Sequence, residues 1–132
     1  MIDTDEVERR ILSELQEAGE ENIASMINTI IDPIGSANET GSLQTALESL
    51  VRAGLVLIAL GGDPTKKLVP LSPDESLAFT AKIATFLQFR ASDNHWTWSQ
   101  NVKPHIVVTP LGRTRADQLM QQRGYQWWRP KR

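Results

Sequence analysis

The chain has 132 residues, and its 14 Lys and Arg against 16 Asp and Glu give a net charge of −2. This length suits one domain with its own apolar core, and the absence of cysteine excludes disulfides, thiolate metal sites and thiol nucleophiles. The acidic amino terminus has no secretory signal and no apolar run approaches the roughly 20 residues of a membrane span, so we expect a single cytoplasmic domain over residues 1–132 with no membrane partner.

Two amphipathic helices are expected before residue 33. The first lies between a cap at Asp3 or Thr4 and a stop at Gly19. The second ends near Asp32, because Pro33 disfavours helical geometry in the residue before it. The apolar positions of the two helices are Val7, Ile11, Leu12 and Leu15, and then Ile23, Met26, Ile27, Ile30 and Ile31.

A third helix over residues 42–53 leads directly into a strand. Ser42 can cap its start, and Gly54 stands just past its end, where a left-handed cap favours a residue without a Cβ. Residues 55–60 have the length and composition of a buried strand. The apolar stripe of the helix consists of Leu43, Ala46, Leu47, Leu50 and Val51.

A fourth helix is predicted over residues 73–89. Turn residues fill positions 61–67 and a short extended piece spans 68–71, before Ser72 and Glu75 form a capping box. The apolar residues of this helix do not keep to one face, which is typical of a helix covered on more than one side. Either a second subunit covers it, which predicts a homodimer, or the other helices of the same chain do.

Two strands and a last helix complete the domain. Residues 95–98 alternate as a strand does and residues 106–109 form another, so the two can pair as a hairpin. Thr109 and Pro110 then provide a cap and a first-turn proline for a helix that stops at Gly124.

The carboxyl-terminal tail, residues 124–132, is basic and aromatic. Residues 1–22 hold eight acids and two arginines, a net charge of −6, so the remaining 110 residues carry +4. From Arg113 to the end of the chain, the aromatic residues Tyr125, Trp127 and Trp128 are interleaved among the cations Arg113, Arg115, Arg123, Arg129, Lys131 and Arg132, which oppose only Asp117. Such a tail either binds phosphates and stacks on bases, or docks its tryptophans on the domain or on a partner subunit.

Two short segments resemble a known bacterial fold. The sequences ALESLVRAGLV at residues 46–56 and VTPLGRTRADQL at residues 108–119 look like parts of the winged helix-turn-helix domain of MarR-like and PadR-like regulators. The resemblance implies a mainly α fold with a small β-sheet (α+β). The helix-turn-helix core would span about 5–60, the inserted helix about 73–89, and the second wing strand and carboxyl-terminal helix about 105–123.

The chain departs from that family in two places. The link over residues 32–41 has ten residues where the family has a tight turn. The interval over residues 61–104 has 44 residues between the two wing strands, where a short hairpin is usual.

The resemblance implies a homodimeric DNA-binding transcriptional regulator that reads the major groove with the helix at about 42–53. The dimer contact would be the helix at 73–89 or the carboxyl-terminal helix. Glu48 on the helix at about 42–53 would repel phosphates, and Arg52 is the one basic residue on its outward face. The expected contacts are Gln44, Thr45, Ser49, Arg52, Lys66 and Lys67, with Trp127, Trp128 and Arg129 of the tail as possible partner or nucleic-acid contacts.

The alternative interpretation is a winged-helix module that binds a protein partner and does not bind DNA. In that case the aromatic segment around Trp96 and Trp98, or the tail around Trp127 and Trp128, would hold a protein partner. Three features favour this second interpretation, namely the acidic overall charge, the long link over residues 32–41 and Glu48.

No enzyme, metal or cofactor signature is evident. His95 and His105 are ten residues apart, without the spacing of metal ligands. Residues 61–67 follow an apolar strand but lack the spacing of a phosphate-binding loop. The acidic pairs at 20–21 and 74–75 are explained as helix starts, where acids favour the positive end of the dipole. We therefore expect a non-enzymatic protein without a cofactor.

Overall fold

The computed structural model describes residues 3–61 and 67–129 of the chain. Its helices are α1 (Thr4–Ala18), α2 (Ile23–Ile30), α3 (Ala37–Arg52), α4 (Pro73–Thr80), α5 (Ile83–Phe86) and α6 (Pro110–Arg123). Its strands are β1 (Glu20–Asn22), β2 (Val56–Leu60), β3 (Val69–Pro70), β4 (Leu87–Arg90), β5 (His95–Trp98) and β6 (His105–Val108). The fold is therefore mixed, with more helix than strand, and the predicted α+β class is confirmed at this level.

The strands form two small antiparallel sheets. The larger has the order β1-β6-β2-β3, and the smaller pairs β4 with β5. In the larger sheet Val56 of β2 lies opposite Val108 of β6. The hairpin predicted between residues 95–98 and 106–109 is therefore wrong, because β6 is occupied by β1 and β2 on its two edges and β5 pairs with the strand just before it.

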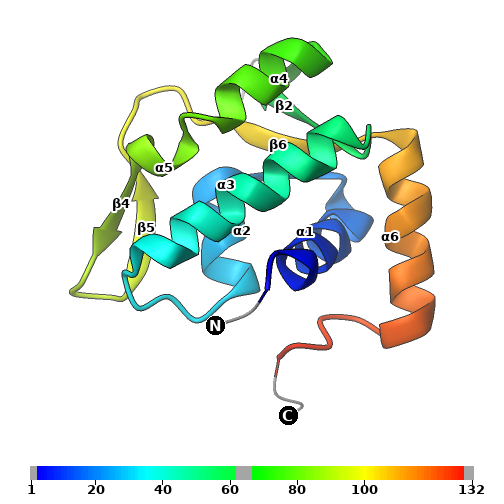
Figure 1. The fold of residues 1–132 in the computed structure, drawn as a ribbon, viewed down its shortest axis with the longest axis horizontal. Coiled ribbons are helices and arrows are strands. Elements are labelled where there is room, and N and C mark those ends of the chain that lie inside the picture. The colour runs from blue at the N-terminus through cyan, green and yellow to red at the C-terminus, as the bar shows by residue number, and fades with distance from the viewer. Residues whose placement is uncertain (1–2, 62–66, 130–132) are drawn as a thin grey trace.

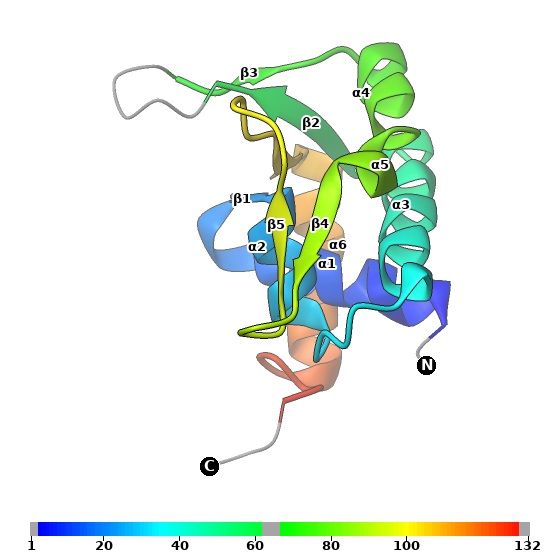
Figure 2. The ribbon, with the colours of Figure 1, turned by 90° about the vertical axis from the view of Figure 1, so that its left-hand side faces the viewer.

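The core lies where α1, α2 and α3 pack against one another and against β2 and β6. Figure 1 shows α3 crossing the front of the molecule, with α6 along one side and the β4–β5 hairpin at the other. Figure 2 shows β2 and β3 extending on the side away from α3. The largest fully buried side chains are Ile11, Leu15, Ile23, Met26, Ile27, Ile30, Leu43, Leu47, Leu50, Ile58, Ile83 and Ile106.

Most of the predicted helix ends are confirmed. The side chain of Asp3 caps α1, Gly19 ends it in the left-handed conformation, and the hydroxyl of Thr109 caps α6. Gly54 has a φ of +76°, a conformation that favours glycine. Gly112 in the first turn of α6 is needed for lack of space, because a Cβ there would lie 1.9 Å from the carbonyl oxygen of Leu55.

Helix α3 begins five residues earlier than the predicted start at Ser42. Its cap is Ser36, whose hydroxyl accepts a hydrogen bond from a first-turn amide while Glu39 bonds back to the amide of Ser36, a complete capping box. The predicted ten-residue link over 32–41 is therefore wrong. The connection from α2 to α3 covers only residues 31–36.

The single helix predicted over residues 73–89 is also wrong. The segment consists of α4, a turn at residues 81–82, the short α5 and the strand β4. Phe86 packs against Trp98 and Phe89 against Trp96, with ring centroids 5.5 and 5.2 Å apart. Apolar and polar residues alternate only from Leu87 to Arg90, as expected of the strand β4, while Ile83 and Leu87 are buried within the chain.

Strand β1 replaces the helix start predicted at Glu20 and Glu21. These residues pair with β6, where Glu20 lies opposite Val107 and Glu21 opposite Ile106. The carboxylate of Glu20 is hydrogen-bonded to Nδ1 of His105 on β6. The acids at this point thus belong to a strand edge, and the cap of α2 is Asn22.

Among the described helices, none is both long enough and apolar enough to cross a membrane.

Candidate functional site

Helix α3 is buried along one face and open along the other. Its predicted apolar stripe lies in the core. The opposite side is exposed at Asn38, Gly41, Thr45 and Arg52, with Glu48 partly buried between them. A Cβ added at Gly41 would meet no atom within 4 Å. This open face offers amide, hydroxyl and guanidinium groups to a partner, and carries one acid and one cation.

Gln44 and Ser49, two of the predicted DNA contacts, make hydrogen bonds inside the protein. The side-chain oxygen of Gln44 accepts from the amide of Ala84, at 3.1 Å. The hydroxyl of Ser49 donates to the carboxylate of Glu8, at 2.9 Å. Helix α3 lies between α1 and the α4–α5 segment, so its two flanks face protein and only the stripe from Asn38 to Arg52 is open.

The cations predicted beside α3 are dispersed. Lys67 is exposed and lies next to Gly61, since a Cβ on Gly61 would be 2.9 Å from the Lys67 carbonyl oxygen. Arg52 lies before the first residue of β2, whereas Lys67 lies near its last. The five residues of this strand span about 17 Å, so the two cations are far apart. Lys66 and most of the turn predicted at 61–67 lie outside the described residues.

The described part of the tail is docked on α1 and α2. Nε1 of Trp127 donates to Glu6, at 2.9 Å, and Nε1 of Trp128 donates to the carbonyl of Thr29, at 3.4 Å. Arg129 donates to the same carbonyl, at 3.1 Å. Of the two alternatives for the tail, this geometry corresponds to tryptophans held against the domain. Residues 130–132 lie outside the described part.

Glu6 joins the tail to α1 and α6. Besides Trp127, its carboxylate accepts from Nε of Arg10 at 3.0 Å and from Nη1 of Arg123 at 2.9 Å. Burial alone raises the pKa of Glu6, but the hydrogen bonds from Trp127, Arg10 and Arg123 outweigh it and leave the pKa below its ordinary value. The guanidinium of Arg10 also lies 5.5 Å from the ring centroid of Trp128.

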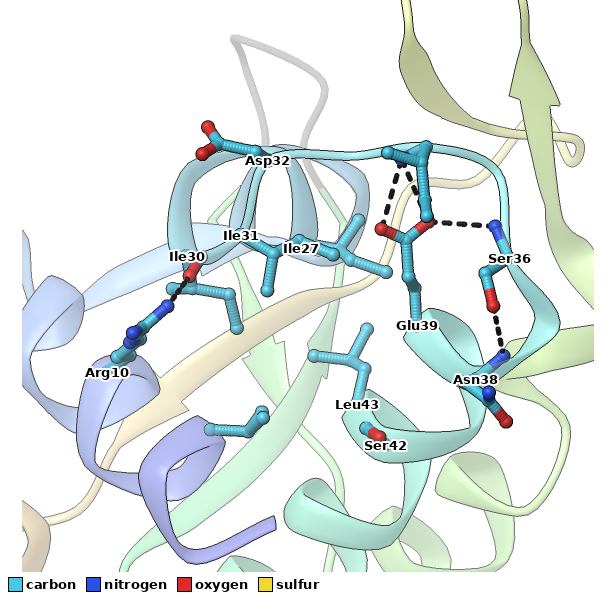
Figure 3. Close-up of a pocket in the computed structure, with 12 residues that line it drawn as sticks. Arg10, Ile27, Ile30, Ile31, Asp32, Ser36, Asn38, Glu39, Ser42 and Leu43 are labelled. Carbon is cyan, nitrogen blue, oxygen red and sulfur yellow. Dashed lines mark hydrogen bonds between the residues drawn. The ribbon is translucent and has the colours of Figure 1, made fainter. Parts of the chain in front are cut away.

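A cavity of about 450 Å³ opens between α1, α2, α3 and the connection over residues 31–36. Figure 3 shows aliphatic side chains of α2 and α3 facing it, with the carboxylate of Glu39 turned toward residues 34–36. That carboxylate accepts from the amides of Ile34, Gly35 and Ser36. The indole of Trp96 also donates to it, at 3.3 Å. The position of this cavity was not predicted, although the spacing of Ser36 and Glu39 is a capping-box signal that would have placed the start of α3 beside it.

The predicted partner surface of Trp96 and Trp98 is largely used within the chain. Trp96 is 7% exposed, and both its backbone groups pair with the side chain of Asn28 at 2.8 Å. Trp98 donates to the carbonyl of Val102 and stacks on Phe79, with ring centroids 6.2 Å apart. These two rings fasten the hairpin to the domain rather than standing free.

The described residues contain no cluster of three His, Cys, Asp or Glu that could hold a metal ion. His95 bonds to the carbonyl of Asp93, and His105 to Glu20, so the two histidines are engaged separately. The structure thus leaves two candidate binding regions, namely the open face of α3 and the cavity beside its first turns. Comparison of the chain with protein-family models, curated proteins and solved structures found no match.

Proposed function

We propose that this protein binds double-stranded DNA through the open face of α3, as a regulator of the winged helix-turn-helix type. One observation carries the proposal: α3 is packed on the core along its apolar stripe while Asn38, Gly41, Thr45 and Arg52 stay exposed. Figure 1 shows this helix crossing the front of the molecule. An α-helix presented in this way fits the major groove.

The strand pairing supports the same proposal. β2, which follows α3, pairs along its length with β6, which leads into α6. These are the two strands that the resemblance implies for the wing. The shortened connection between α2 and α3, six residues in place of the expected ten, also lies nearer to a helix-turn-helix than the sequence indicated.

The reading residues proposed now differ from those expected. Thr45 and Arg52 remain, and Asn38 joins them, because amide, hydroxyl and guanidinium groups all bond to base edges or phosphates. Gln44 and Ser49 are left out, since each is bonded inside the protein. Gly41 allows a close approach of the helix backbone to a ligand.

The test is fluorescence anisotropy with a mixed pool of labelled DNA duplexes, at about 50 and 200 mM salt. We expect binding that falls steeply with salt. Arg52→Ala should weaken it about three- to tenfold at the lower salt concentration, because one phosphate contact is lost. Lys103→Ala is the matched control, since Lys103 is an exposed cation in the loop before β6, and it should bind like the natural chain.

Absence of binding at the lower salt concentration would refute the proposal. Equal loss in the Arg52 and Lys103 variants would refute the assignment to α3, because it would indicate a diffuse attraction by net charge. Both variants change exposed side chains, so their folding should be unaffected.

A protein-interaction module is the second candidate, and the charge distribution favours it. Glu48 offsets Arg52 on the open face of α3, while Lys67 lies at the far end of β2. Such a face is nearly neutral, whereas DNA affinity depends on neutralised phosphates. One measurement separates the two candidates. Binding of DNA should weaken steeply as the salt concentration rises, whereas binding of a protein partner to this face need not.

For the homodimer, we propose α6 as the contact. Ile83 and Leu87 of the 73–89 segment are buried, and Leu77, Phe79 and Phe89 are partly buried against the core of the same chain, which weakens the reason for assigning this segment to a second subunit. Leu111 near the start of α6 is 60% exposed, and Tyr125 just after its end is 58% exposed. These side chains are the apolar groups that α6 offers to a second copy.

A further inference from the structure

We propose that the cavity between α1, α2 and α3 is a binding site for a small, uncharged, mainly apolar molecule. Its volume of about 450 Å³ falls within the range of about 300–1,000 Å³ that is usual for small-molecule sites. The inference concerns a cavity that shares only Asn38 with the open face of α3, and it stands whether or not the protein binds DNA.

Six of the twelve residues that line the cavity are aliphatic. They come from three helices and from the connection over residues 31–36, so a ligand would be enclosed from several directions. Ile34 is 78% exposed and lines the same cavity, which makes it the apolar group most available to an entering molecule. Burial of apolar surface is the main source of affinity that such walls offer. The aliphatic lining consists of Val7, Ile27, Ile30, Ile31, Ile34 and Leu43.

The charged groups beside the cavity are already engaged or point elsewhere. Arg10 donates to Glu6 and, at 2.8 Å, to the carbonyl of Ile30. Glu39 accepts three backbone amides and the indole of Trp96. Figure 3 shows the carboxylate of Asp32 turned away from the aliphatic side chains. A charged ligand would therefore lose its hydration without meeting a free counter-charge, which is costly, whereas an uncharged apolar ligand pays no such cost.

A second, smaller hollow in the described part of the chain has a different character. It measures about 180 Å³ and lies between α1, the end of α3 and α6. Four of its eight lining residues, Asp5, Glu8, Arg9 and Arg115, carry charge. It is too small and too polar for the same class of molecule.

The probe for the test is N-phenyl-1-naphthylamine, an uncharged dye whose emission rises in apolar surroundings. It is titrated into the full chain without DNA, beside an anionic, sulfonated analogue of the same ring system. We expect saturable binding of one dye per chain, with clearly weaker binding of the anion. Ser42→Phe should weaken the binding several-fold, because Ser42 lines the cavity from α3 and a phenyl ring there would occupy part of it.

Thr45→Phe is the matched control. It adds the same ring one turn along α3 at an exposed position outside the cavity, so dye binding should persist. Ile34→Asp is a second test that keeps the cavity open and alters only an exposed residue, so it remains informative if Ser42→Phe fails to fold. A carboxylate placed there should weaken binding of the uncharged dye several-fold.

The inference is overturned if the natural chain does not bind the dye saturably, or if folded Ser42→Phe and Ile34→Asp bind it as the natural chain does. Tighter binding of the anionic analogue than of the uncharged dye would overturn the ligand class. Because no DNA is present in this experiment, its failure leaves the DNA proposal untouched, and failure of DNA binding leaves the cavity untouched.

Discussion

The Glu21 carboxyl group lies in surroundings that disfavour its ionised form. Burial raises its pKa above the ordinary value, a hydrogen bond from Ser25 opposes this, and the nearby carboxylates of Glu14 and Glu20 add to the rise. A carboxyl whose pKa is higher in the folded state destabilises the fold where it is ionised, and this cost is absent below the pKa of the unfolded chain. We therefore expect Glu21→Gln to increase the free energy of unfolding at pH 7.

Urea denaturation at several pH values measures this difference. The gain from Glu21→Gln should shrink as the pH falls through the raised pKa and vanish below the ordinary value of 4.5. Glu17→Gln, on the exposed end of α1, serves as the control for a simple change of net charge. A gain that persists unchanged in acid would show that the Glu21 carboxylate is not the cause.

At the scale of elements, one side chain fastens the β4–β5 hairpin to the helices. The amide of Asn28 on α2 donates to the carbonyl of Trp96 and accepts from its N–H, each at 2.8 Å, as a neighbouring strand would. We expect Asn28→Ala to reduce the free energy of unfolding by about 1–3 kcal/mol, because two backbone groups beside a buried ring lose their partners.

Hydrogen exchange at the Trp96 amide gives the local measurement, since exchange there should speed up in Asn28→Ala. Asn28→Asp is the comparison variant, because its carboxylate still accepts from the Trp96 N–H but no longer donates to the carbonyl. It should keep more of the protection at that amide than Asn28→Ala does. Equal protection in all three proteins would mean that the hairpin is held by its aromatic contacts alone.

Elements with a strong local signal were predictable from the sequence. The stop at Gly19, the cap at Thr109 and the strand after Gly54 follow from backbone rules that act over a few residues. Strand β1 could not be found in this way, because its three polar residues form a strand only by pairing with β6. The two strands are far apart in the chain, since Glu20 and His105, which are hydrogen-bonded, are separated by 85 positions. The break between α4 and β4 likewise depends on aromatic pairing with β5.

The candidate site, too, could be predicted only in part from the sequence. Helical spacing placed Thr45 and Arg52 on the side away from the core stripe, where the structure has them exposed. The same spacing placed Gln44 and Ser49 there, but α1 and α5 come from other parts of the chain and cover the flanks of α3. The cavity was missed because its walls come from three helices, whose relative placement is not encoded in any local pattern.

At the scale of the whole molecule, Glu6 ties the two ends of the described chain together. Its carboxylate on α1 accepts from Arg123 at the end of α6 and from Trp127 in the tail, each at 2.9 Å. Because its pKa is lowered in the folded protein, its stabilising effect is present above the ordinary value of 4.5 and is lost as the pH falls through the lower, folded value. Hydrogen bonds to a charged group each contribute about 1.5–3 kcal/mol.

A double-mutant cycle measures how much of this stability passes through the tail. Trp127→Phe keeps an aromatic ring but removes the N–H that Glu6 accepts, and Glu6→Gln removes the charge. Each single variant should unfold at lower urea concentration at pH 7, and the double variant should lose less than the sum of the two, with a coupling of about 0.5–3 kcal/mol. The coupling should disappear in acid, where Glu6 is protonated in both states. Strict additivity at pH 7 would mean that the tail is held by ring packing on α1 and α2, with the Trp127 hydrogen bond contributing nothing.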